Sequence, residues 1–170
     1  SNLCFTGDTM VAVADGRNSV RIDELSGTEF TVYSARKSKT RCAWFTEIKP
    51  AKAFKTGTRE IVEVELEDGS TFRCTPDHLL ACKDTRWIEA QDSVGVTLES
   101  YTQFKNQYGH LMVNTHSDGH RRQARMIWEY HNNRSSGGFH VDHIESGDND
   151  SIENLQLLTK EDHMAKTALE

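Results

Sequence analysis

The sequence lacks the marks of a membrane or secreted protein. No apolar run approaches the length that spans a bilayer, and the start has no charged-then-apolar signal segment. The four cysteines, Cys4, Cys42, Cys74 and Cys82, form no CxxC pair, so we expect no zinc site built from them. Their wide spacing gives little support to a disulfide scaffold, which favours the reducing cytoplasm and no membrane partner. We expect the last three to be small core hydrophobes.

An excess of positive charge is also missing. The 170 residues carry a formal net charge of −6, which argues against broad non-specific binding to nucleic acid but allows a local basic patch. The sequence has no internal repeat and no low-complexity segment. With 36% hydrophobic and 27% charged residues, it is typical of a globular chain.

The first half of the chain has the pattern of short strands. Apolar stretches flank an Asp15-Gly16 turn, and the alternation in "EIVEVELEDGSTFRC" turns at Asp68-Gly69, which is typical of a hairpin. "FTVYSARK" and "KPAKAFKTG" indicate further strands. Many short strands and few helical stripes predict a mainly β domain over residues 1–100.

The second half is mixed, and the boundary falls near residues 95–108. "HRRQARMIWEYHNN" has apolar residues at helical spacing and predicts a helix from His120 to Tyr130. "HVDHI" predicts a strand and "DSIENLQLLT" a second extended stretch. Thr159 is expected to cap a terminal helix. The sequence therefore predicts a small α+β domain over residues 101–170.

Four polar side chains in this second domain form a candidate site for metal-dependent chemistry. Asp142 and His163 offer the oxygen and imidazole ligands that suit a divalent cation, with positions left for phosphate and water. Since Asp142 and His143 are adjacent on a strand, their side chains should point to opposite faces. His143 is then left to take a proton from water near neutral pH. The amide of Asn154 can bridge loop backbone groups and hold the strand in place.

This stretch resembles the HNH nuclease family through its "DHI" core, its "NDSIENLQLLT" segment and the helical His163. The resemblance implies a ββα-metal module that cuts double-stranded DNA at a homing site with one divalent ion, usually Mg²⁺. It implies Asp142 and His163 as metal ligands, His143 as general base and Asn154 as the residue that orients the loop. A histidine beside an aspartate is most often a surface pair, but four residue types in the family's order favour the nuclease.

A dense basic run precedes the predicted site. His120, Arg121, Arg122 and Arg125 are our candidates for contacts to DNA phosphates. A solvated helix face has the same pattern, so both interpretations stay open.

The cysteine at position 4 is unusual because chain ends seldom bury anything. It is an incidental tag residue, a disulfide partner or a nucleophile. "GSTFRCTPDH" places Thr75 and His78 three residues apart after a strand. A histidine near a peptide bond can protonate its nitrogen, while a threonine hydroxyl polarises the carbonyl. Attack by the Cys4 sulfur on the Leu3 carbonyl would exchange the amide for a thioester.

Cys4, "GDTMV", "VRIDEL" and "GSTFRCTPDH" together resemble the opening blocks of an intein, the Hint domain shared with hedgehog-type autoprocessing proteins. The resemblance covers residues 4–95. It implies a β-horseshoe that splices itself out of a host protein (the extein) without a cofactor. Cys4 would be the first nucleophile, with Thr75 and His78 assisting the N-to-S acyl shift. Residues 1–3 would belong to the flanking extein or a tag.

The closing strands of an intein, with His-Asn before Cys, Ser or Thr, have no match. The one His-Asn pair, at His131 and Asn132, lies in the predicted helix. We therefore expect an incomplete horseshoe, as in a split intein that needs a C-terminal intein fragment as partner; a longer intein shortened for study is the other interpretation. The alternative functions are an HNH DNA endonuclease, or a DNA-binding module, with a splicing-inactive Hint half.

Overall fold

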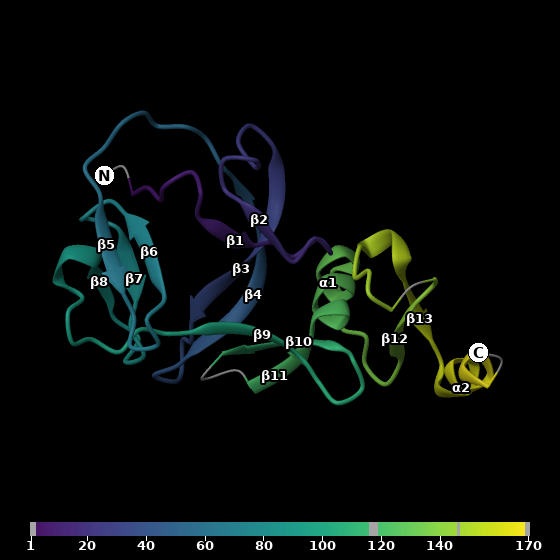
Figure 1. Cartoon of the computed structure of the whole chain (residues 1–170). Coiled ribbons are helices and arrows are strands. Elements are labelled where there is room, and N and C mark those ends of the chain that lie inside the picture. The colour runs from purple at the N-terminus through teal and green to yellow at the C-terminus, as the bar shows by residue number, and fades with distance from the viewer. Residues whose placement is uncertain (1–2, 116–118, 146, 169–170) are drawn as a thin grey trace.

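The computed structural model describes residues 3–115, 119–145 and 147–168 (Figure 1). Its first part consists of antiparallel ribbons followed by a short 3₁₀ turn. The ribbons are β1 (Met10–Ala12) with β2 (Ser19–Arg21), β3 (Glu29–Lys37) with β4 (Trp44–Lys52), β5 (Val62–Glu65) with β6 (Thr71–Cys74), and β7 (Leu79–Ala81) with β8 (Trp87–Glu89); the turn is η1 (Ala90–Asp92).

The β5–β6 hairpin forms as its sequence predicts. Val62 and Val64 are half-buried over a small cluster that includes Cys74, while the alternating glutamates face solvent. Gly69 at the turn has a φ of 80°, a left-handed value that suits glycine. Cys74 and Cys82 are fully buried, as expected, but Cys42 is exposed, and its thiol lies 3.3 Å from the hydroxyl of Thr85. The expectation that Cys42 is a core residue was therefore wrong.

The prediction for the β3–β4 ribbon was right for β3 and misplaced for β4. β4 begins at Trp44 and ends at Lys52, so it contains only the start of "KPAKAFKTG". Trp44, Thr46 and Ile48 alternate as buried residues along it. This period of two, within the segment "WFTEI", sets the strand. The Trp44 indole also donates a buried hydrogen bond of 2.7 Å to the Cys82 carbonyl.

The second part is a small α/β unit that completes the mostly β architecture, as predicted. A three-stranded sheet has the order β11-β10-β9, and a hairpin of β12 and β13 follows helix α1. The elements are β9 (Tyr101–Lys105), β10 (Leu111–Thr115), β11 (Gly119–Arg122), α1 (Gln123–Asn132), β12 (His140–His143), η2 (Ile152–Asn154), β13 (Leu155–Leu158) and α2 (Lys160–Thr167). Neither helix in the described parts combines the length and apolar character needed to cross a bilayer.

The boundaries of both helices follow from their capping residues. Asn133, in the left-handed conformation, ends α1, and the Thr159 hydroxyl caps α2, as predicted, by accepting from the backbone of Asp162 at 3.1 Å. The start of α1 differs from the prediction. Residues His120 to Arg122 pair with β10 and extend the sheet instead of forming the first helical turn.

One hydrophobic cluster joins the two parts of the chain. Ala14 and Ile48 of the β part pack with Ile127 and Trp128 of α1 and with further residues of the second part. α1 contacts β4 on one side and the β12–β13 hairpin on the other (Figure 1). The small α/β unit is therefore packed directly against the β part. The domain division at residue 100 stays a prediction.

Candidate functional site

The N-terminal segment lies against the chain just after β6. The Cys4 carbonyl accepts a hydrogen bond of 2.9 Å from the Thr75 amide, and the Cys4 amide donates one of 3.2 Å to the Thr75 hydroxyl. Thr75 is buried, so its hydroxyl is held in place. The nitrogen that donates is the nitrogen of the Leu3–Cys4 peptide bond. The structure therefore brings Thr75 to the bond that the thiol would attack.

The His78 ring packs against the ring of Phe5, the residue that follows Cys4. The two rings have their centroids 4.0 Å apart, and the His78 amide bonds the Thr75 carbonyl in a tight turn. Burial lowers the pKa of His78, with a weaker opposing effect from Asp77, so the ring is neutral near pH 7. Its buried Nδ1 has no hydrogen-bond partner among the described residues. A neutral ring with an unused nitrogen is suited to proton exchange.

The structure adds Thr56, which the sequence pattern did not reveal. The Cys4 sulfur lies 3.2 Å from the Thr56 hydroxyl, on the loop between β4 and β5. The two residues are 52 positions apart, and only a Thr-Gly turn signal marks the segment, where Gly57 has a φ of 106°. The half-buried thiol of Cys4 thus has a hydroxyl partner from one loop, while the Cys4 backbone is held by Thr75 from another segment.

The second site begins on β12 and includes α2. Asp142 Oδ1 lies 3.5 Å from His163 Nε2, so the structure brings together the two predicted metal ligands. The other carboxylate oxygen accepts from Lys166 at 2.8 Å and from Gln156 at 3.3 Å. Burial opposes ionisation of Asp142, but these two hydrogen bonds, together with the charges of Lys166 and His163, outweigh it and hold the pKa of Asp142 below its usual value.

The donor pair fits a divalent cation. Two ligands in adjacent positions around an ion at ~2.1 Å lie ~3 Å apart, close to the separation of the Asp142 and His163 donor atoms. No group of three or more His, Cys, Asp or Glu side chains that could hold a metal occurs in the described ranges. The role of Asp142 and His163 as metal ligands therefore stays a prediction.

His143 faces a different neighbour. Its Nε2 lies 2.6 Å from Asp150 Oδ1, and both side chains are largely buried. Within the described ranges its ring contacts Asp150 rather than Asp142 or His163, in agreement with opposite faces of β12. Asp150 was not predicted, because "GDND" is typical of a solvated turn and the contact forms only when the loop folds back.

Asn154 closes the loop between β12 and β13. Its side chain accepts from the Glu145 amide at 2.9 Å and donates to the Asn149 carbonyl at 2.8 Å, and its own carbonyl accepts from the Ile144 amide. The loop that carries Asp150 is therefore fixed by one buried amide. This geometry agrees with the orienting role expected for Asn154, and its part in catalysis stays a prediction.

The four basic candidates for DNA contacts differ in how far contacts within the protein already engage their side chains. Arg121 and Arg125 both form ion pairs with Glu129, at 3.3 and 3.5 Å, so the Glu129 carboxylate partly neutralises their charge. Exposed His120 packs edge-on against Phe104.

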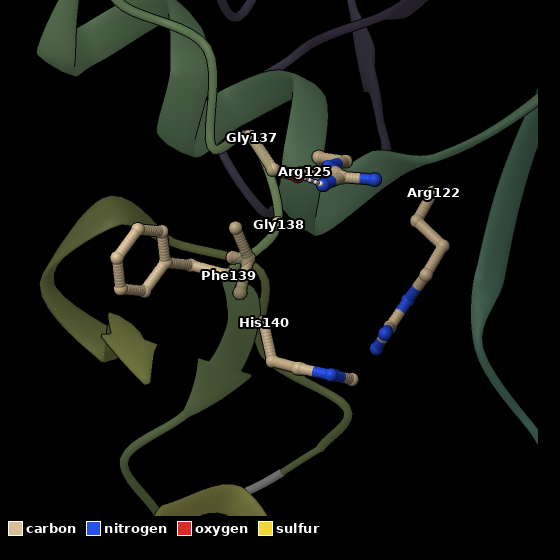
Figure 2. A pocket seen from close by; sticks show the side chains of 7 residues that line it. Arg122, Arg125, Gly137, Gly138, Phe139 and His140 are labelled. Atoms are coloured by element: carbon tan, nitrogen blue, oxygen red, sulfur yellow. Dashed lines mark hydrogen bonds between the residues drawn. The ribbon is translucent and has the colours of Figure 1, made fainter. Parts of the chain in front are cut away.

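Arg122 is half-buried and lies 3.2 Å from the His110 ring. It lines a pocket of about 350 Å³ between α1 and the start of β12. Figure 2 shows the Arg122 and His140 side chains pointing toward one another there. His140 in turn stacks on His163, with ring centroids 4.7 Å apart. The pocket therefore places positive charge next to the predicted metal ligands.

The comparison with known proteins gives one family match and one similar solved structure. Residues 124–165 match the model of the HNH endonuclease family, which confirms the expected resemblance to HNH nucleases in this segment. Among solved structures, the chain is similar to a mutant of the Ssp DnaB mini-intein, with a TM-score of 0.45 and 13% identity over 70% of this chain and 86% of the other.

Two curated proteins are similar in sequence. One is the ribonucleoside-diphosphate reductase large subunit of Invertebrate iridescent virus 6, 30% identical over 108 residues, or 63% of this chain. The other is a DNA gyrase subunit of Synechocystis, 33% identical over 94 residues, or 52% of this chain. The chain spans 8% of the length of each relative. The family match covers the segment that contains Asp142, His143, Asn154 and His163, so residues 124–165 are similar to the HNH endonuclease family.

Proposed function

We propose that the chain belongs to a protein-splicing intein that carries an HNH homing endonuclease. The observation that carries the splicing half of the proposal is the hydrogen bond from the amide of the Leu3–Cys4 bond to the Thr75 hydroxyl. A hydroxyl on the nitrogen of a peptide bond that is next to a thiol is an arrangement suited to activation of that bond, and the unpaired nitrogen of His78 beside Phe5 offers a proton carrier in the same region.

The proposed reaction exchanges an amide for a thioester. The Cys4 sulfur attacks the Leu3 carbonyl carbon, the carbon–nitrogen bond breaks, and the thiol proton ends on the released Cys4 amino group. Thr56 holds the thiol from one side and can accept its hydrogen bond, while Thr75 contacts the leaving nitrogen. Neutral His78 takes up the thiol proton at its unpaired Nδ1 and, once protonated, passes that proton to the leaving nitrogen.

The two curated relatives support an insertion that is shared by different hosts. A reductase subunit and a gyrase subunit match this chain over a small share of their own lengths. Since the matched shares of this chain together exceed its length, the two matches overlap. A segment common to proteins with such different names is what a self-removing insertion would produce. Extein sequences on both sides and a C-terminal intein segment would be its partners for complete splicing.

The HNH domain is proposed to cut double-stranded DNA at the homing site. Asp142 and His163 would hold Mg²⁺ or another divalent cation, which when bound offsets negative charge on the phosphate. His143 takes a proton from the attacking water. Arg122 and His140 bind a neighbouring phosphate in their pocket.

One experiment separates this proposal from its alternative. The chain is given a longer peptide before Leu3, and release of that peptide by a strong thiol is measured beside DNA cleavage in Mg²⁺ or Mn²⁺. Thiol-dependent release that is lost in Cys4→Ala supports splicing chemistry. DNA cleavage that survives Cys4→Ala and is lost in His143→Ala, with no thiol-dependent release in any variant, favours a nuclease with an inactive Hint half.

A further inference from the structure

A buried glutamine links the β part of the chain to the nuclease domain. Gln123 is the first residue of α1 and is only 1% exposed. Its amide oxygen accepts from the Tyr33 hydroxyl at 2.9 Å and from the Gln103 amide at 2.5 Å. Its amide nitrogen donates to Asn18 and to Asp150, each at 3.1 Å. A buried side chain with four partners has one orientation, because any rotation leaves polar atoms unpaired.

The last of these partners continues the link to the predicted general base. The second oxygen of Asp150 lies 2.6 Å from His143 Nε2, and Asp150 is 7% exposed. A carboxylate on one ring nitrogen fixes both the tautomer and the direction of an imidazole. In the tautomer that donates from Nε2 to Asp150, Nδ1 is the ring nitrogen that faces away from this contact and is left as an acceptor.

A backbone contact forms a second, independent link at the same place. Gly16, in the turn between β1 and β2, has a φ of +96°, and a Cβ added there would lie 2.6 Å from the Ser151 nitrogen. The turn is therefore seated directly on the backbone beside Asp150, and no side chain fits between them. Asn18, which holds Gln123, belongs to this turn and is itself left-handed, with a φ of 69°.

We infer that the β part positions the nuclease base: the turn of residues 15–18 and Gln123 hold Asp150, and Asp150 orients His143. Gln123 and Asp150 are positioning residues, since neither reaches the substrate in this arrangement. The inference rests on the proposed nuclease function of His143. It makes the HNH domain dependent on the Hint half for the geometry of its site.

Two glycine variants of the whole chain test this directly. Gly16→Ala adds a methyl group against Ser151, whereas the matched control Gly69→Ala has a similar left-handed φ of +80° and nothing within 4 Å. We expect Gly16→Ala to lower kcat for DNA cleavage by ~10- to 100-fold, because small displacements of a catalytic group have effects of this size. KM and the Kd for DNA should change less than about twofold, and Gly69→Ala should leave all three constants near wild type.

Gln123→Met provides a second variant that removes the amide but keeps the volume. It should show the same selective loss of kcat. Thermal unfolding and thiol-dependent release at Cys4 are measured in parallel to confirm that the variant folds. A fall in kcat that is matched by a fall in DNA affinity and in both of these readings would mean a general structural role and would overturn the inference.

The imidazole signals of His143 separate failure of this inference from failure of the proposed function. Ring ¹⁵N resonances are recorded in the metal-free chain without DNA. Shifted His143 signals in Gly16→Ala and Gln123→Met, but not in Gly69→Ala, support positioning even where the wild type cuts no DNA, a result that would overturn only the nuclease function. Unchanged His143 signals and an unchanged kcat in both variants overturn the positioning itself.

Discussion

The Thr75 hydroxyl and the Cys4 amide are joined by a 3.2 Å hydrogen bond across the end of β6. The reciprocal bond from the Thr75 amide to the Cys4 carbonyl, at 2.9 Å, makes the contact a two-point clamp. The clamp holds the Leu3–Cys4 peptide at a fixed place beside buried Thr75. A peptide held this way keeps its orientation while the thiol approaches.

Loss of either partner should stop or slow thioester formation. Cys4→Ala should abolish thiol-dependent release of an upstream peptide, and Thr75→Val should slow it by about tenfold or more, because a hydroxyl that contacts the reacting bond is removed. Mass spectrometry of the released peptide gives the rate. Cys42→Ala is the matched control, since this exposed thiol lies near Thr85 rather than near the bond. Normal release in Thr75→Val would contradict the clamp.

Thr56 should act through its hydroxyl. Thr56→Val removes the atom that lies 3.2 Å from the Cys4 sulfur but keeps the shape of the side chain, so release should slow several-fold. Thr56→Ser keeps the hydroxyl and should restore most of the rate. The rates are compared at equal thiol concentration. Equal loss in both variants would point to packing of the loop instead of contact with the thiol.

Acid should weaken the fold through His78. Burial lowers its folded-state pKa below the ordinary 6.5, so the folded state binds fewer protons than the unfolded state between those two values. Its stabilising effect is therefore present above about pH 6.5 and is lost as the pH falls through that window. Denaturant unfolding at several pH values should show a smaller acid loss in His78→Gln.

The pKa of His110 is shifted in the same direction as that of His78, so His110 serves as the comparison. Burial, with the nearby Arg122 charge, also lowers the His110 pKa, so a residual acid dependence should remain in His78→Gln. His110→Gln should remove that remainder. An acid dependence of the wild type that is unchanged in both variants would contradict the assignment.

Removing the Lys166 charge should strengthen binding of divalent cations. Its ammonium lies 2.8 Å from Asp142, so a cation at the Asp142–His163 pair meets like charge. Lys166→Met should tighten Mn²⁺ binding several-fold by calorimetry, and Asp142→Asn should weaken it strongly. Lys160→Met, which removes an exposed charge at the other end of α2, is the control. Tightening of equal size in both lysine variants would indicate a general charge effect.

The two parts of the chain should unfold together. Ile127 is fully buried in the cluster shared by both parts, so Ile127→Ala should lower the free energy of unfolding by ~2–5 kcal/mol. Single-tryptophan proteins that keep either Trp44 or Trp128 report on the β part and the nuclease part separately. Their denaturation midpoints should coincide and shift together in Ile127→Ala. Two separated transitions would contradict a common core.

Local signals were enough to predict much of this structure. The Asp68-Gly69 turn, the cap at Thr159 and the strand that holds Asp142 and His143 each depend on neighbouring residues, so a sequence pattern contains them. The pairing of Asp142 with His163 also followed from the order of residue types.

Features that depend on contacts between distant segments were missed. The helix was expected to start at His120, but pairing of this segment with β10 made it a strand, and nothing within the segment signals that partner. Thr56 and Asp150 were overlooked for the same reason, because each meets its partner only after the chain folds back. Glu129 also forms ion pairs with Arg121 and Arg125, and the positions of the basic residues in the sequence do not reveal these pairs.

The packing of Ile48 and Tyr33 against the second part has a consequence for minimal versions of this protein. Deleting residues 124–165 would uncover Ile48, which is only 7% exposed here, and would remove the α1 residues of the cluster against which Tyr33 packs. A shortened splicing unit would thus expose an apolar patch on β3 and β4 that favours aggregation. Polar replacements at these two positions would have to accompany the deletion for the shortened chain to remain monodisperse.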